Sequence, residues 1–435
     1  MKIALYESDT LEQDLASAWQ DVKPLYDQLH AYVRHKLHLH HGDEVMEATG
    51  LIPAHLLGDI GDTPICTWCN IANFTKPYPK KSAIDVSEAM IKQGWKPETM
   101  FKKADDFIHS LGLKKVPASF WTKSHFEKNG IESLCSGATS WDFYDSNDYR
   151  VSSCTEVSQD NFNIANAELS GIQYQMQFSN QSFLYRKIPT AAFHGAVGFS
   201  LSAIPSSTPD YFQQIGLLGK DVDIADKETN INLLLKALTV VIWISDAYLL
   251  ETFRFDLLSG RIPKEDMNCH FWKLKSEIHG LRPAMERNNQ QFDVGKNIMY
   301  GEQGQGGEQD WGFSHYFMDS ILRYQFYQEL CLVSGRYLKI SIHKSKSSRY
   351  IFIYKLLTQV DTSLYTFVPT SGKYVKDDPG KPLHQCNYYG SKEAGDKIGN
   401  VMKMGASRPW KDVLELMTGN KICQQKREFL QYLDY

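Results

Sequence analysis

Two short motifs carry side chains that could bind a metal or exchange electrons. Cys66 and Cys69, in the run Cys-Thr-Trp-Cys, have the two-residue spacing of redox and metal-binding cysteine pairs. His38 and His41 belong to a histidine-rich stretch and would share one face of a helix, where they could bind stray metal. We interpret the cysteine pair as incidental and the histidines as part of a solvated helix face.

The composition describes a large folded protein without a global charge that would attract nucleic acid. The chain has 435 residues, a hydrophobic share of 42% and a net charge of −4, so a sizeable core is expected and no nucleic-acid partner is predicted. The most apolar stretch, Leu233 to Leu250, contains Lys236 and Asp246 and predicts a buried helix, not a membrane span. The apolar run Ile3 to Tyr6 is too short for a signal peptide, so none is predicted.

The spacing of apolar residues predicts a mainly α fold. They recur at intervals of three and four in at least two segments, at Leu15, Trp19, Val22, Leu25, Leu29 and Val33, and at Ile164, Ala167, Leu169, Ile172 and Met176. Asp9 or Thr10 is placed to cap the first helix, Ser87 to open another, and Gly112 to end the segment from Ala104 to Leu111.

Residues 336–372 differ from the rest of the chain. The segment is basic, aromatic and β-branched, and Ile351 to Tyr354 suit a strand. Ser334 to Tyr337 recur as Ser371 to Tyr374, so removing the segment would rejoin the chain without a gap. We interpret it as a surface insertion or a translated intron. A basic patch for nucleic acid or membrane is the alternative, but no fold motif accompanies the charge.

Seven phrases of the sequence occur, in this order, in one known family. They are HAYVRHKLHLHHG, LIPAHLLGD, MIKQGWKPETMFKKADDFIHSLGL, SWDFYDSNDYR, GIQYQMQF, YQFYQELC and GSKEAGDKIGNVMKMGASRPW. Together they resemble the angiotensin-converting enzyme family, the peptidyl-dipeptidase A metallopeptidases, from about Ser8 to Tyr435 outside the insert. The resemblance implies a two-lobed helical ellipsoid with a central groove, a zincin-like fold in which a zinc-bound water releases C-terminal dipeptides.

The same resemblance implies where the protein lies and how it is divided. It suggests an extracellular or membrane-associated protein, and one peptidyl-dipeptidase-like domain over residues 1–435, interrupted at 336–372. The N-terminal lid helices of the family are expected to be missing.

The metal ligands of the family are lost from the corresponding positions. A zincin helix carries two histidines four residues apart with a general-base glutamate after the first, and a downstream carboxylate completes the site. By resemblance, the two histidines correspond to Ala167 and Gly171, the downstream glutamate to Gly195, and the aspartate that orients a zinc histidine to Phe199. None of the three ligand positions has a donor side chain, so no metal cofactor is predicted, although the family uses zinc and chloride.

Three residues keep the family's types. Glu168 stands at the general-base position, Tyr316 at the position that stabilises the tetrahedral intermediate, and His194 beside the lost third ligand. Without a metal-bound water, Glu168 has no substrate for proton transfer, so we expect Glu168 and His194 to be polar groove residues and Tyr316 to be a core aromatic.

The substrate and chloride positions have also changed. The family holds the peptide's C-terminal carboxylate with a glutamine, a lysine and a tyrosine, which correspond here to Cys66, Asn297 and Phe313. The arginines that bind chloride correspond to Lys275 and His315. We therefore expect neither the carboxylate anchor nor chloride activation to be retained.

Cysteine and asparagine positions agree with an extracellular origin. By resemblance, Cys135–Cys154 and Cys331–Cys386 correspond to loop-closing disulfides of the family. Asn73 and Asn180 each begin a glycosylation sequon.

The sequence predicts a non-catalytic, zinc-free member of this family that binds peptides or an extracellular protein through the former substrate groove. The alternatives are an active zinc metallopeptidase, which would need a metal site that the sequence does not offer, and a fragment without independent function.

Overall fold

The protein is mainly α-helical in a computed structural model, as the apolar spacing predicts. The structure describes residues 6–43, 45–47, 49–57, 84–127, 138–145, 147–222, 227–291, 293–294, 312–337 and 383–419, with only the backbone of 227–238. The predicted strand at residues 351–354 and most of the predicted insertion lie outside these ranges. Among these residues, none of the helices combines the length and the apolar character that a membrane span requires.

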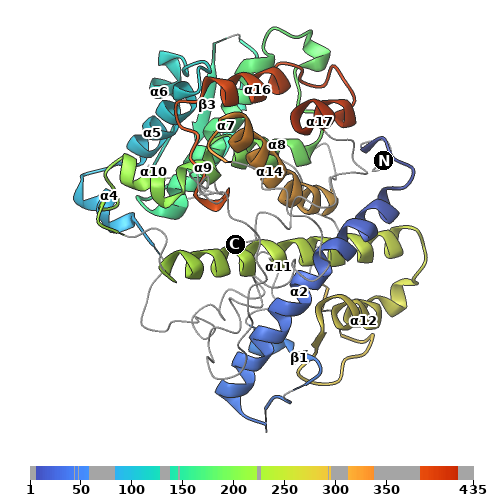
Figure 1. The fold of residues 1–435 in the computed structure, drawn as a ribbon. Coiled ribbons are helices and arrows are strands. Elements are labelled where there is room, and N and C mark those ends of the chain that lie inside the picture. Colours follow the sequence, from blue (N-terminus) through green and yellow to red (C-terminus); the bar gives the residue numbers. More distant parts are fainter. Residues whose placement is uncertain are drawn as a thin grey trace, which may run out of the picture.

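One group of helices contains the predicted site and lies in the upper half of Figure 1. Its longer members are α5 (Pro97–Ser110), α7 (Gln159–Phe178), α8 (Ala191–Gly198), α14 (Ser314–Val333), α16 (Lys392–Met402) and α17 (Trp410–Thr418). Its shorter members are α4 (Ser87–Lys92), α6 (Ala118–Lys123), α9 (Ile204–Ser206), α10 (Pro209–Gln214), η5 (Phe183–Tyr185) and η9 (Leu383–Gln385). Helix α8 continues into η6 (Phe199–Ala203), a turn of π-helix. Helix α14 packs against α8, α11 and α16 and so connects this group to the second one.

The second group is built around two long helices that cross each other in Figure 1, α2 (Leu11–His41) and α11 (Lys227–Leu258). Helix α12 (Met267–His279) packs on α11 after the short η7 (Lys264–Asp266). A two-residue parallel bridge pairs β1 (Ile52–Pro53) with β4 (Leu281–Arg282), and η1 (Ala54–Leu56) follows β1. The two-lobed outline with a central groove stays a prediction.

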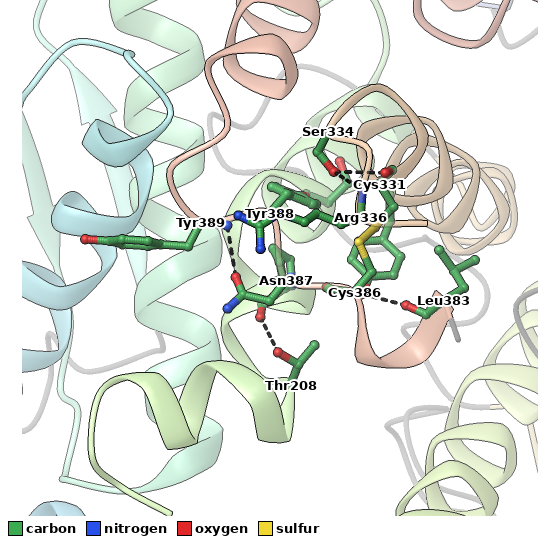
Figure 2. Close-up of a disulfide and its surroundings, with 12 residues drawn as sticks. Thr208, Cys331, Ser334, Arg336, Leu383, Cys386, Asn387, Tyr388 and Tyr389 are labelled. Atoms are coloured by element: carbon green, nitrogen blue, oxygen red, sulfur yellow. Dashed lines mark hydrogen bonds between the residues drawn. A yellow bond between two sulfur atoms is a disulfide. The ribbon is translucent and has the colours of Figure 1, made fainter. Parts of the chain in front are cut away.

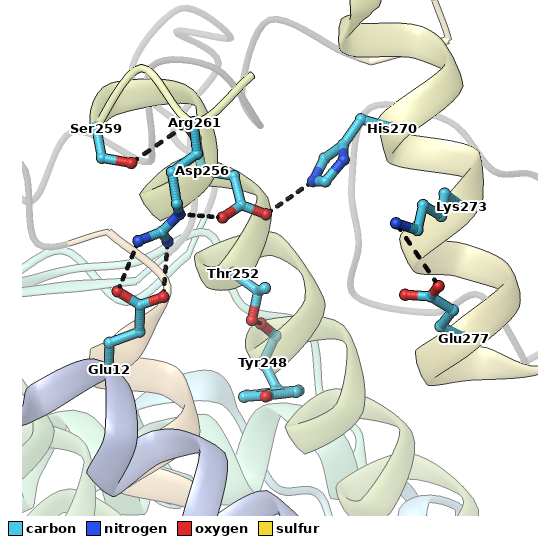
Figure 3. Close-up of polar contacts among 9 residues, drawn as sticks. All are labelled: Glu12, Tyr248, Thr252, Asp256, Ser259, Arg261, His270, Lys273 and Glu277. Carbon is cyan, nitrogen blue, oxygen red and sulfur yellow. Dashed lines mark hydrogen bonds and ion pairs between the residues drawn. The ribbon is translucent and has the colours of Figure 1, made fainter.

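A charged cluster ties α2 to the end of α11. Figure 3 shows the guanidinium of Arg261 between the carboxylates of Glu12 and Asp256. Its Nη2 lies 2.6 Å from Oε1 of Glu12, and its Nε lies 2.6 Å from Oδ1 of Asp256. The other oxygen of Asp256 lies 2.7 Å from Nε2 of His270 on α12. Arg261 and Asp256 together therefore link α2, α11 and α12.

A short antiparallel ribbon stands beside α7. Strand β2 (Thr139–Asp142) pairs with β3 (Tyr149–Ser152), with Ser140 opposite Val151. On the other side of β3, Ser152 forms an isolated parallel β-bridge with His125. Among the described residues no strand pairs with the other edge of β2, so β2 is an edge strand of the ribbon as far as the structure describes it.

Several sequence predictions of local structure are confirmed. Helix α4 begins at Ser87, Gly112 follows α5 with a φ of +88°, and the stretch from 233 to 250 is part of α11. Thr10 precedes α2 as predicted, but its side chain makes no cap hydrogen bond and its hydroxyl donates to Asp14 instead. Ile164, which the periodicity places on a buried face, is 42% exposed.

Candidate functional site

Helices α7 and α8 bring together the positions expected for a metal. Ala167 and Gly171 lie one turn apart on α7, and His194 and Gly195 lie on α8. The two helices approach closely: a Cβ added to Gly198 would lie 3.5 Å from the backbone oxygen of Ala167. Helix α7 is capped by Ser158, the residue before its first turn, whose hydroxyl accepts a hydrogen bond from the backbone N–H of Asn161.

Neighbouring side chains occupy the space at Gly171. A Cβ at this position would lie 3.1 Å from Oγ of Ser140 on β2 and 3.2 Å from Nε2 of His194 on α8. These distances are shorter than ordinary van der Waals contacts, so both neighbours would have to shift for a side chain to be accommodated.

The space at Gly195 is filled more tightly, by Asp319 of α14. A Cβ on Gly195 would lie within 2.5 Å of Cγ and Oδ2 of Asp319 and 2.7 Å from its Oδ1. Asp319 forms an ion pair with Arg323 one turn further along α14. The guanidinium carbon of Arg323 lies 3.9 Å from the ring centroid of Phe199, within the range of a cation–π contact.

Glu168 is a carboxyl group with restricted access to water. Burial raises its pKa to about 7, and a hydrogen bond with Ser140 opposes part of that rise. At neutral pH the group is therefore close to half protonated, which is the range in which a general base or acid works. The hydrogen-bond partner of the Glu168 carboxyl group is the hydroxyl of Ser140 on β2.

His194 is accessible to water but surrounded by protein. Its side chain is exposed, yet desolvation by the surrounding atoms lowers its pKa. The two observations agree for a side chain in a recess, where water reaches the ring but the neutral form is favoured.

Tyr316 lies in an aromatic cluster at the first turn of α14. Its ring centroid is 5.2 Å from that of Trp243 and 3.8 Å from that of His315. The side chain is half-buried. By helical spacing Tyr316 shares a face of α14 with Asp319 and Arg323. On this face, Asp319 lies against Gly195 of α8 and Arg323 lies over the ring of Phe199.

The chain matches the family model of angiotensin-converting enzyme, Peptidase_M2, over residues 1–358 and 370–434. The chain belongs to the angiotensin-converting enzyme family. The interruption of the match falls inside residues 336–372.

Curated members of this family are similar over nearly the whole chain. The angiotensin-converting enzyme of Haematobia irritans exigua is 36% identical over 424 residues, which are 97% of this chain and 61% of the relative. The enzyme of Mus musculus is 36% identical over 419 residues, 96% of this chain and 28% of the relative. The angiotensin-converting enzyme-like protein Ace3 of Mus musculus is 34% identical over 98% of this chain and 50% of that protein. The chain thus spans less than two thirds of the length of these relatives.

The residues present do not fit the zinc ion of the angiotensin-converting enzyme family. Ala167, Gly171 and Gly195 offer no donor atom, and the space beside Gly195 already holds the carboxylate of Asp319. Within the described ranges no three His, Cys, Asp or Glu side chains gather in a way that could hold a metal. Glu168 and His194 supply two donor groups, and zinc takes at least three protein ligands.

One of the three carboxylate-anchor positions can be placed. Phe313 is 2% exposed, and its backbone N–H donates to Oε2 of Glu251, 2.7 Å away, at the start of α14. Its ring is core and has no hydroxyl to offer a substrate. Cys66 and Asn297 lie outside the described residues, as do Cys69 and Asn73.

The two positions expected for chloride arginines are used in internal contacts. Lys275 is 5% exposed, with its ammonium 3.6 Å from Oδ1 of Asp246. Nδ1 of His315 lies 2.7 Å from the backbone oxygen of Gly312. Lys275 thus has a carboxylate counter-ion inside the protein.

The predicted disulfide Cys331–Cys386 is confirmed. It joins the last turn of α14 to the segment after η9 (Figure 2), with a Cα separation of 6.2 Å across 55 residues of sequence. The hydroxyl of Tyr327 reinforces the junction by donating to the backbone oxygens of Leu383 and Cys386 at 2.9 and 2.6 Å. Cys154 is also disulfide-bonded, while its predicted partner Cys135 lies outside the described residues. Asn180 is exposed in the turn after α7.

Three residues of the site were missed from the sequence: Ser140, Asp319 and Arg323. The last two are four apart in the sequence, a spacing that indicates an ion pair where the segment is helical. Nothing in the sequence showed that this pair would face Gly195, because the contact depends on how α14 packs against α8.

Proposed function

We propose that this protein is a non-catalytic member of the angiotensin-converting enzyme family that binds peptides or an extracellular protein through the former substrate groove. The observation that supports this most strongly is at the third ligand position, where Gly195 has replaced the expected glutamate and Asp319 fills the space. Glu168 and Tyr316 would then be remnants of the general base and of the residue that stabilises the transition state.

The experiment that tests the loss of catalysis is metal analysis of the purified protein combined with a tripeptide hydrolysis assay. No zinc and no dipeptide release are expected. Stoichiometric zinc with chelator-sensitive release would show an active peptidase instead.

Strand β2 supports the binding role. In the antiparallel ribbon the N–H of Phe143 donates to the backbone oxygen of Asp148 at 3.0 Å. By alternation the backbone N–H and C=O groups of Ser140 and Asp142 face away from β3. An extended peptide could add to such an edge as a further strand.

A pair of substitutions tests this binding mode. Ser140→Pro removes the outward N–H, whereas Ser140→Ala keeps it and removes only the hydroxyl. The probe is a fluorescent tripeptide with a free C-terminal carboxylate, titrated into each protein. We expect binding to the parent protein and to S140A, and a loss of at least ten-fold in S140P. Equal affinity of S140P and S140A would contradict strand addition, and no binding of the tripeptide to the parent protein would contradict peptide binding in the groove.

We further propose an extracytoplasmic location and a single domain interrupted at residues 336–372. The Cys331–Cys386 disulfide and the bonded Cys154 support an oxidising compartment, and the exposed Asn180 is accessible to glycosylation. Expression in a secretory system followed by enzymatic removal of N-linked glycans tests the location. The expected result is a mobility shift that is reduced in Asn180→Gln. No shift in the parent protein would count against glycosylation.

A further inference from the structure

Gly195 and Asp319 fit together as a pair from two helices. Gly195 lies on α8 and Asp319 on α14, and a single added Cβ at 195 would bring three carboxyl atoms of Asp319 within 2.7 Å of it. This is far inside van der Waals contact. By comparison, a Cβ on Gly198 of the same helix would meet nothing nearer than 3.5 Å. Of the two glycines on α8, only Gly195 is therefore crowded in this way.

Asp319 is not free to move out of this space. The residue is 6% exposed, and its carboxylate is bound by the guanidinium of Arg323. That guanidinium lies over the ring of Phe199, which follows α8 directly. Turning the Asp319 side chain away would break the ion pair in a poorly hydrated place, which is costly for both charges.

A glutamate at position 195 would add a second problem. Its carboxylate would lie beside that of Asp319, and two carboxylates at close range repel one another in a low-dielectric setting. The position that the family uses for a metal-binding carboxylate is thus blocked here by both volume and charge.

We infer that Asp319 and Arg323 structurally replace the side chain lost at position 195, so that this position must now be glycine and returning the metal ligands alone cannot rebuild the zinc site. This inference rests on the proposed loss of the metal and deepens it. Phe199, at the position of the family's orienting aspartate, takes part in the replacement because it supports Arg323.

A comparison of two glycines tests the pairing. We expect Gly195→Ala to lower the thermal midpoint, while Gly198→Ala leaves it unchanged or raises it, because alanine is the better helix former where it fits. In a background of Asp319→Ala and Arg323→Met, in which methionine can still pack on Phe199, G195A should lose its effect. Equal midpoints for G195A and G198A in the parent protein would overturn the inference. A G195A effect that persists unchanged in the D319A/R323M background would do the same.

Metal binding supplies the second test. One variant carries A167H, G171H and G195E, and another carries these three changes together with D319A and R323M. Cobalt(II) is the probe, because its visible absorption reports tetrahedral coordination, and zinc content is measured in parallel. We expect stoichiometric metal only in the five-substitution variant. The inference is wrong if the three-substitution variant binds metal equally well, or if the five-substitution variant binds no better than it.

These outcomes are separate from a failure of the proposed function. Zinc bound stoichiometrically by the parent protein would contradict the loss of the metal itself. The glycine comparison needs no metal and no activity, so it tests the Gly195–Asp319 pair in either case.

Discussion

A hydrogen bond between Glu168 and Ser140 joins α7 to the edge strand β2. Glu168 stands where the family has its general base, and the bond links this carboxyl to the strand that we propose as the peptide-binding edge. Burial raises the pKa of Glu168 to about 7, so the protonated group can donate to the serine near neutral pH while the ionised group only accepts. The ionisation of Glu168 should therefore be visible in the stability of the protein.

The first prediction concerns the pH dependence of that stability. The pKa of Glu168 is raised from its ordinary value of 4.5 to about 7. Between pH 4.5 and pH 7 the native state therefore holds a proton that the unfolded state has lost. The free energy of unfolding must then fall as pH rises through this window. Glu168→Gln removes the titrating group. Relative to the parent protein, E168Q should gain roughly 1 to 3 kcal/mol between pH 5 and pH 8, measured by urea unfolding at several pH values.

The control for this prediction is Glu415→Gln, which removes one carboxylate from an exposed position of α17. The free energy of unfolding of E415Q should change with pH in the same way as that of the parent protein across this range. If the free energies of unfolding of E168Q and the parent protein differ by the same amount at every pH, the pKa of Glu168 is not raised.

The second prediction concerns the disulfide. Replacing Cys331 and Cys386 together with serine removes the link across 55 residues and should lower the free energy of unfolding by roughly 2 to 4 kcal/mol. Cys269 is an exposed free cysteine, so Cys269→Ser is the matched control and should change little. Urea unfolding under non-reducing conditions measures both. An unchanged midpoint for C331S/C386S would indicate that Tyr327 and the surrounding packing hold the junction without the bond.

The sequence predicts the long helices well, because their apolar residues repeat over many turns. The stretch Leu233 to Leu250 is apolar for most of its length, and it forms part of α11. The Cys331–Cys386 pair was predicted by resemblance and is confirmed. Both predictions rely on features that can be recognised in the sequence itself, a long apolar run and the positions of two cysteines.

The parts that could not be predicted depend on how the helices pack. Asp319 is far from Gly195 in sequence, and only the approach of α14 to α8 places its carboxylate there. The π-helical turn at Phe199 to Ala203 has no simple sequence signal. Ile164 has the spacing of a core residue but is 42% exposed, because periodicity predicts a face and not the partner that covers it.

The third prediction concerns Arg261, which joins α2 to α11. Arg261→Ala removes contacts to Glu12 and Asp256. Because the guanidinium is partly exposed, the expected loss is only about 0.5 to 1 kcal/mol, and it should shrink at high salt. Lys92→Ala, which removes an exposed ion pair with Glu88 inside α4, is the control and should cost less. A loss that does not change with salt would show that the aliphatic part of Arg261 matters more than its charge.

The fourth prediction concerns the buried pair of Lys275 and Asp246. The lysine ammonium lies 3.6 Å from Oδ1 of Asp246 and 3.4 Å from Nδ1 of His279, and the lysine and the aspartate are 5% and 3% exposed. Lys275→Met removes the positive partner and leaves the Asp246 charge in a poorly hydrated place, so the free energy of unfolding should fall by about 3 to 5 kcal/mol.

Replacing both partners separates the pair from simple packing. D246N/K275M leaves no buried charge at either position and should recover most of the stability that K275M loses, because a neutral amide is far less costly to bury than a carboxylate. Urea unfolding at pH 7 measures both variants. If D246N/K275M is as unstable as K275M, Lys275 contributes through its packing in α12. If K275M is as stable as the parent protein, His279 and water compensate the charge of Asp246. Position 275, which corresponds to a chloride-binding arginine of the family, would then need no positive charge for stability.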